Sequence, residues 1–111
     1  MTDRVTLENR CDELLKARIE AKEDWCVAYL DYHNLKDRTD DLLKVCMDEV
    51  QAEHEEELPE NKLTRLAKRT DKWREHKQGL SIAREKELRA RIHLDNIRKE
   101  QELTMTRYMK S

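Results

Sequence analysis

The sequence contains very few of the residues that interrupt helices. It has one Gly, one Pro and no Phe in 111 residues. A strand-rich domain needs several turns, which Gly and Pro most often form, so this composition excludes a strand-rich fold. Ala, Glu, Lys, Leu and Arg account for 59 residues, which is typical of long helices and coiled coils. The net charge is only −2 although 43% of residues are charged, so we expect an ordered all-α fold.

Long apolar segments and paired cysteines are also missing. No apolar run approaches the roughly 18 residues that a membrane-spanning helix requires, and no apolar leader segment opens the sequence. The three cysteines, Cys11, Cys26 and Cys46, form no C-x-x-C motif. Free thiols are usual in a reducing compartment. We expect a cytoplasmic protein without membrane contact, whose cysteines pack as small apolar residues.

The N-terminal half carries a heptad repeat in which the spacing alternates between four and three residues. Such a repeat predicts a helix that packs along one side. A further apolar heptad position widens the stripe and favours contact with more than one neighbouring helix. The first position holds Leu7, Leu14, Ala21, Ala28, Leu35 and Leu42, the second Cys11, Arg18, Trp25, Tyr32, Thr39 and Cys46, and the further one Leu15, Tyr29, Leu43 and Val50.

The repeat ends in an acidic run at residues 53–57, which is followed by Leu58 and Pro59. Proline inside a helix removes a hydrogen bond and clashes with the preceding turn, at a cost of about 3 kcal/mol. At the first position of a new helix it costs little, and Glu60 suits the positive end of the helix dipole. We therefore predict a first helix at about 5–57, a turn near 58–61 and a second helix at about 60–108.

The second half has a weaker heptad repeat, because Glu87 and Gln101 interrupt it. Small alanines opposite larger residues would allow two helices to approach closely. The larger residues of the repeat are Leu66, Trp73, Leu80, Leu94 and Tyr108, and the smaller series three residues further on is Ala83, Ala90 and Ile97.

Two helical segments of similar length with a short connection favour an antiparallel helical hairpin, a coiled coil that forms a single domain over residues 1–111. The alternative is one continuous helix kinked at Pro59 in a parallel dimer. Because a two-helix hairpin has little interior, we expect it to oligomerise into a helical bundle. The predicted assembly seam is Leu7, Leu14, Trp25, Tyr32, Leu35, Leu42, Leu66, Trp73, Leu80 and Leu94.

The charges divide at the predicted turn. Residues 1–60 contain 8 Lys and Arg against 18 Asp and Glu, a balance of −10, whereas residues 61–111 contain 15 against 7, a balance of +8. Either the acidic helix neutralises the basic one, or the basic helix presents a stripe that binds nucleic-acid phosphates. The candidates for phosphate binding are Lys62, Arg65, Lys68, Arg69, Lys72, Arg74, Lys77, Arg84, Arg91 and Arg98.

No specific catalytic or metal motif is present. None of the four histidines completes a Glu-x-x-His motif, and the one glycine excludes a glycine-rich phosphate loop. We therefore expect neither enzyme activity nor a metal, cofactor or small-molecule substrate. Trp25, Tyr29 and Tyr32 cluster on the first helix, either as an aromatic layer of the core or as a hot spot for a partner protein.

The second half of the sequence contains Ala67, Trp73, Gly79-Leu80, Ala83-Arg84, Arg98, Glu102, Arg107 and Met109-Lys110. Between Leu63 and Lys110, it resembles short all-helical proteins that tailed bacteriophages encode beside their DNA replication and recombination genes. That resemblance implies a non-enzymatic phage protein in the host cytoplasm that assists a recombinase or a single-strand-binding protein.

Three functional hypotheses follow from these observations. The first is an oligomeric accessory factor of DNA metabolism that binds single-stranded DNA, a recombination protein or both through the basic second helix. The second is a protein–protein interaction module, such as an adaptor, a scaffold or an inhibitor of a host protein, with no nucleic-acid contact. The third is a building block of a virion or filament.

Overall fold

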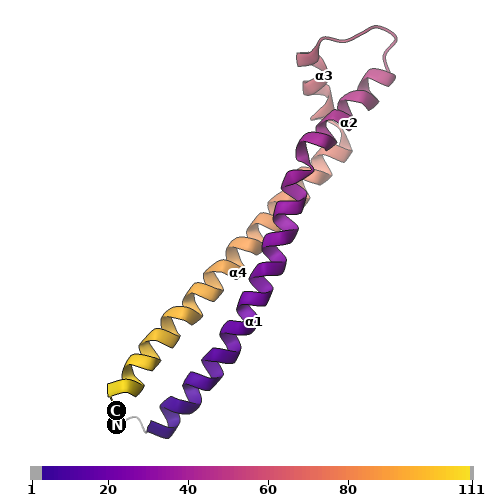
Figure 1. Cartoon of the computed structure of the whole chain (residues 1–111). Coiled ribbons are helices and arrows are strands. Elements are labelled where there is room, and N and C mark those ends of the chain that lie inside the picture. The colour runs from indigo at the N-terminus through magenta and orange to yellow at the C-terminus, as the bar shows by residue number, and fades with distance from the viewer. Residues whose placement is uncertain (1–3, 111) are drawn as a thin grey trace. The chain divides into compact units, whose positions relative to one another are not determined.

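The computed structural model describes residues 4–110 and consists of four α-helices. The helices are α1 (Arg4–Asp37), α2 (Thr39–Ala52), α3 (Glu60–Ala67) and α4 (Asp71–Lys110), and no β-strand occurs between residues 4 and 110. The chain reverses direction between α2 and α3, which pack against each other (Figure 1). The predicted all-α helical hairpin is confirmed, and the alternative of one continuous helix kinked at Pro59 is wrong.

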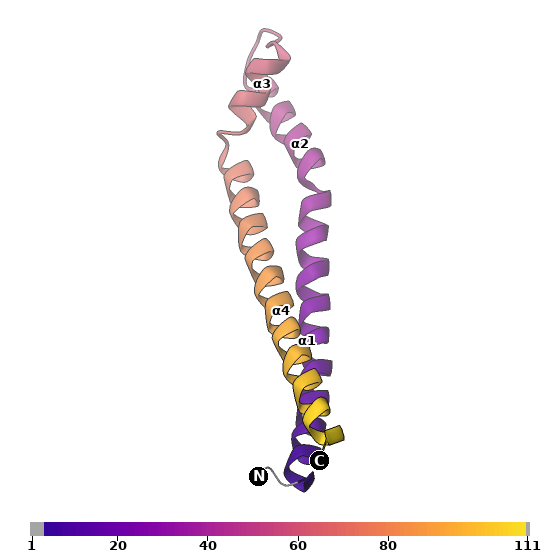
Figure 2. The ribbon, with the colours of Figure 1, turned by 90° about the vertical axis from the view of Figure 1, so that its left-hand side faces the viewer.

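Packing divides the chain into two compact units, each of which joins an outgoing and a returning segment. Unit 1 contains residues 1–29 and 85–111, and unit 2 contains Leu30–Arg84. In unit 1, α1 and α4 lie side by side and run in opposite directions, as both views of the ribbon show (Figures 1 and 2). Each unit has a hydrophobic core of its own.

We call α1 and α2 the outgoing limb, and α3 and α4 the returning limb. The outgoing limb is divided into two helices at Arg38, where a single helix was predicted. The Arg38 amide donates to the carbonyl of Leu35, three residues back instead of four, at 3.3 Å. The hydroxyl of Thr39 donates to the same carbonyl, also at 3.3 Å. Threonine hydroxyls that bond in this way often bend helices, and this bond lies at the interruption.

The outgoing limb also ends earlier than predicted, at Ala52 instead of about residue 57. The residues that follow are four glutamates and a histidine, and carboxylates are unfavourable at the negative C-terminal end of a helix dipole. The side chain of Gln51 forms two hydrogen bonds with the segment that connects α2 to α3. Its amide nitrogen donates to the carbonyl of Glu56 at 2.9 Å, and its oxygen accepts from the amide of Leu58 at 3.0 Å.

The returning limb begins at Glu60, and Pro59 is the N-cap residue immediately before α3. This limb is also divided, at residues 68–70, where continuous helix was predicted. The hydroxyl of Thr70 accepts the amide of Trp73 at 3.3 Å, and Asp71 follows at the positive end of α4. Thr70 thus acts as an N-cap, which satisfies a backbone donor at the start of α4.

In unit 1 the core consists of Leu14, Ala21, Leu94 and Ile97, with Ala17 and Trp25 packed against them. Arg18, Glu87 and Gln101 are polar residues at apolar heptad positions, and each forms a hydrogen bond between the two helices beside this core. Arg18 donates to the side-chain oxygen of Gln101 at 2.8 Å, and the indole nitrogen of Trp25 donates to Glu87 at 3.2 Å. Each interruption on one helix is therefore matched by a polar partner on the other.

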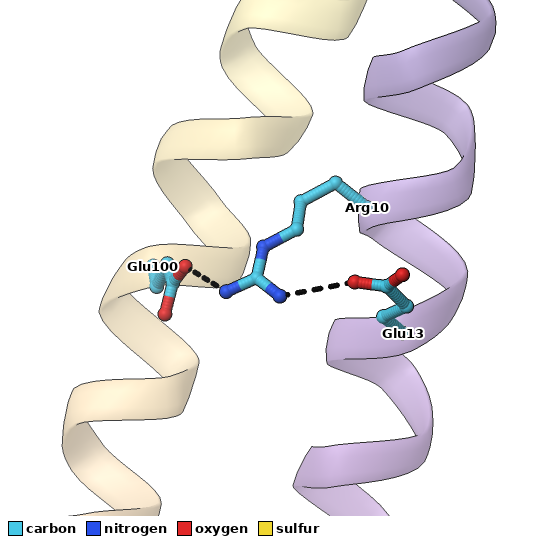
Figure 3. Close-up of polar contacts among 3 residues, drawn as sticks. All are labelled: Arg10, Glu13 and Glu100. Atoms are coloured by element: carbon cyan, nitrogen blue, oxygen red, sulfur yellow. Dashed lines mark hydrogen bonds and ion pairs between the residues drawn. The ribbon is translucent and has the colours of Figure 1, made fainter.

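A charged contact joins the two helices of unit 1 at Arg10 (Figure 3). The guanidinium lies between the carboxylates of Glu100 on α4 and Glu13 on α1, with the contact to Glu13 at 3.1 Å. The hydrogen bond to Glu100, followed by that to Glu13, raises the pKa of Arg10. All three side chains are at least 45% exposed, so this contact contributes little to the free energy of unfolding. Its main effect is to favour the antiparallel orientation of the two helices.

In unit 2 the core forms around Cys46, Ala67 and Trp73, which are 0%, 0% and 8% exposed. Leu42, Leu43 and Met47 pack against these residues. Thr39 is a polar residue at an apolar heptad position, and its Oγ1 lies 2.9 Å from Nε2 of His76. Both limbs of the unit therefore contribute apolar and polar residues to the same contact.

The residues of the predicted assembly seam are all at least partly covered within the single chain. Four of them are buried and six are half-buried, so the hairpin itself uses the side of the helices on which the seam lies. The buried residues are Leu7, Leu14, Trp73 and Leu94, and the half-buried residues are Trp25, Tyr32, Leu35, Leu42, Leu66 and Leu80.

Candidate nucleic-acid interface

The basic residues singled out from the sequence divide between the two units. Eight of these residues belong to unit 2, and all eight are exposed. Lys62 and Arg65 lie on α3, and Lys68 and Arg69 lie between α3 and α4. The first part of α4 carries Lys72, Arg74, Lys77 and Arg84. Arg91 and Arg98 belong to unit 1 and are exposed and half-buried, respectively.

The basic residues of unit 2 recur at helical spacing. Lys62, Arg65 and Arg69 follow one another at intervals of three and four, which places them on one side of α3 and its C-terminal end. On α4, Arg74 and Lys77 are three residues apart, and Arg84 follows Lys77 after seven. Unit 2 therefore has a basic row on each of its returning segments. We call the residues of both rows together with Lys68 the basic surface.

The two limbs of unit 2 carry opposite charges. Residues 30–59 have 3 Lys and Arg against 10 Asp and Glu, and residues 60–84 have 8 against 3. Only one ion pair of a lysine or arginine joins these limbs within the described residues of unit 2, from Nζ of Lys72 to Glu49 at 2.5 Å. The hydrogen bond to Glu49 raises the pKa of Lys72. The acidic limb therefore makes one direct ion pair with the basic limb among the described residues of unit 2.

The other basic residues of this limb have no carboxylate within ion-pair distance in the described chain. These seven residues are Lys62, Arg65, Lys68, Arg69, Arg74, Lys77 and Arg84. A lysine or arginine side chain without a carboxylate partner keeps its positive charge available to an external anion.

The two candidate arginines of unit 1, Arg91 and Arg98, each have a carboxylate within ion-pair distance. Nε of Arg91 lies 3.8 Å from Glu87, and a terminal nitrogen of Arg98 lies 3.8 Å from Asp95, in each case on the same helix. A carboxylate next to each guanidinium reduces the local positive potential. Arg91 and Arg98 are therefore weaker candidates for phosphate binding than the seven residues of unit 2.

The indole of Trp73 belongs to the core of unit 2 and does not form part of the basic surface. Its side chain packs with Cys46 and Ala67, and the ammonium of Lys77 lies 5.7 Å from the centre of its ring. A base needs an exposed aromatic face on which to stack. Trp73 therefore does not supply a stacking platform beside the basic surface.

Other kinds of site have little support in the described residues. Between residues 4 and 110, no group of His, Cys, Asp and Glu could hold a metal ion, and His54 contacts the carbonyl of Val50 at 2.9 Å. The thiols of Cys11, Cys26 and Cys46 are free. None of the helices described here has the length and apolar character needed to span a bilayer.

The sequence matches no protein-family model, no curated protein and no solved structure. The functional assignment of this helical hairpin therefore depends on the placement and pairing of its own charged residues.

Proposed function

We propose that this chain is a non-enzymatic accessory protein of DNA metabolism that acts in the cytoplasm and binds single-stranded DNA through the basic surface of unit 2. The observation that carries the proposal is that seven of the eight lysines and arginines between residues 60 and 84 have no carboxylate partner in the described chain. Such side chains replace the counterions of phosphates, which supplies most of the affinity in sequence-independent binding.

The spacing of the unpaired residues also supports binding to a phosphate backbone. Arg74 and Lys77 are separated by one helical turn, and Lys62, Arg65 and Arg69 extend along α3 in the same manner. A flexible single strand can follow such a row and place successive phosphates next to it. Because Trp73 is buried, we expect contacts to phosphates without recognition of particular bases.

A pair of matched substitutions tests the proposal. Arg74→Gln removes an unpaired charge of the basic surface, and Arg89→Gln removes an exposed arginine of unit 1 that is bonded to Glu85 at 2.5 Å. We expect Arg74→Gln to weaken the binding of a fluorescently labelled oligonucleotide roughly threefold to tenfold at low salt, and Arg89→Gln to change it little. Fluorescence anisotropy measures both affinities, and equal effects of the two variants would contradict the proposal.

An acidic partner protein is the second candidate, because the same unpaired cations would suit a carboxylate-rich surface. The two candidates differ in what they predict for DNA. If a labelled single strand fails to bind at low salt, while Arg74→Gln weakens capture of a carboxylate-rich protein from the native host, the protein–protein function is the correct one.

A further inference from the structure

Lys72 lies outside the basic surface because a carboxylate of the outgoing limb is bonded to it. Its Nζ lies 2.5 Å from Oε1 of Glu49 on α2. Along the sequence Lys72 lies between Arg69 and Arg74, two residues of the basic surface that have no carboxylate within ion-pair distance in the described chain. This one ion pair therefore interrupts a series of unpaired cations.

The core of unit 2 places Glu49 next to Lys72. Cys46 and Trp73 belong to the same buried cluster. Glu49 follows Cys46 on α2 by three residues, which is about one helical turn, and Lys72 immediately precedes Trp73 on α4. Since Cys46 is 0% exposed and Trp73 is 8% exposed, these two helical segments cannot separate without opening the core. The carboxylate therefore stays close to the ammonium group even while the ion pair itself is open.

The ion pair contributes little to the stability of the fold. The side chains of Lys72 and Glu49 are 48% and 51% exposed, and exposed pairs of this kind are weak. The limbs of unit 2 are held together by the buried cluster instead. The main consequence of the pair is electrostatic, because a carboxylate gives the ammonium group the same kind of charged oxygen acceptor that a phosphate would give it.

We propose that Lys72 is an eighth phosphate-binding residue of unit 2, and that Glu49 masks it by taking the place of a DNA phosphate. This inference rests on the proposed binding of single-stranded DNA and concerns the regulation of the same site. Because Glu49 and Lys72 belong to one folded unit, the carboxylate competes with phosphates at a high effective concentration. In the natural chain the strand contacts the basic surface without Lys72. Removing the charge at residue 49 unmasks the ammonium group.

A substitution at Glu49 tests the masking. Glu49→Gln removes the competing charge and keeps the shape of the side chain. We expect it to raise the affinity for a labelled single strand roughly threefold to tenfold at low salt, because it adds one phosphate contact just as Arg74→Gln removes one. The slope of log K against log salt should become steeper by about 0.7.

Asp48→Asn is the matched control for Glu49→Gln. Asp48 is exposed on the same helix and forms no ion pair in the described chain, so its loss removes the same charge without releasing a cation. Charges that are not in contact are partly screened by salt. We therefore expect Asp48→Asn to change the affinity by less than about twofold and to leave the salt slope unchanged.

Replacing Lys72 shows whether the gain depends on its ammonium group. In the natural chain, Lys72→Gln should change the affinity by less than about twofold, because Lys72 is masked. In the chain that carries Glu49→Gln, the same substitution should abolish the gain. Fluorescence anisotropy measures all four affinities, and circular dichroism confirms that each variant keeps its helical content.

Three results would overturn the masking of Lys72 while leaving the proposed function intact. They are equal gains with Asp48→Asn and Glu49→Gln, a gain that persists after Lys72 is replaced, and a loss with Lys72→Gln in the natural chain as large as that with Arg74→Gln. If neither the natural chain nor Glu49→Gln binds a single strand at low salt, this inference and the proposed function are both overturned.

Discussion

Replacing Trp73 with alanine is expected to lower the free energy of unfolding by about 3–5 kcal/mol, the usual cost of removing a buried tryptophan. Trp73 is 8% exposed and is the largest side chain of the core of unit 2, where it packs with Cys46 and Ala67. Two thin limbs have few other residues that can close the resulting cavity. Guanidinium denaturation followed by the helical circular dichroism signal measures the change.

A conservative variant separates the packing of Trp73 from a direct role in binding. Trp73→Phe keeps an aromatic ring in the core, so we expect the affinity for single-stranded DNA to stay within about twofold of the natural chain at low salt. Hydrogen exchange should show that Trp73→Ala weakens protection first in unit 2. A loss of stability below about 1 kcal/mol would mean that the indole does not belong to the core.

Replacing Leu94 with alanine is expected to cost about 2–5 kcal/mol, because Leu94 is 3% exposed and lies in the core of unit 1 with Leu14 and Ala21. Leu103→Ala provides a matched control on the same helix. Leu103 is 60% exposed, so the same chemical change should alter stability by less than about 0.5 kcal/mol. The denaturation midpoints of the two variants give the comparison, and similar losses at both positions would contradict the packing of α1 against α4 described here.

The sequence was sufficient to predict the hairpin and the side on which each limb is buried. A heptad repeat determines which residues face a neighbouring helix, so Leu14 and Leu94 were identified as contact residues, and both are buried. The chain reversal before Pro59 was predictable for a local reason, because proline cannot continue a helix but can precede one. These properties depend on residues close together in the sequence.

Helix ends were predicted less well, because the signals that determine them are single hydrogen bonds. The division at Arg38 coincides with a bond from the hydroxyl of Thr39 to the carbonyl of Leu35, and the start of α4 coincides with the cap that Thr70 provides. The sequence Thr70-Asp71 is an N-cap signal. Basic residues lie on both sides of it, and the whole segment was therefore predicted as one helix. The acidic run after Ala52 was a comparable signal, since carboxylates oppose the C-terminal end of a helix.

The pairing of residues across the hairpin was not predictable from either limb alone. Arg18 and Gln101 are polar residues at apolar heptad positions of separate helices, and they form a hydrogen bond at 2.8 Å. The same applies to the basic surface. A charge count shows that the limbs of unit 2 are opposite in sign, but only atomic positions show that Lys72 pairs with Glu49 and that Arg74 has no carboxylate within ion-pair distance in the described chain.

The salt dependence of single-stranded DNA binding by the natural chain is the decisive measurement for the basic surface. Each neutralised phosphate of a single strand contributes about −0.7 to the slope of log K against log salt. If four to seven of the unpaired cations engage phosphates, we expect a slope of roughly −3 to −5, and a loss of affinity on the order of a hundredfold or more between 50 and 200 mM salt. A slope near zero, or no binding even at the lowest salt concentration, would contradict a phosphate-binding function for this hairpin.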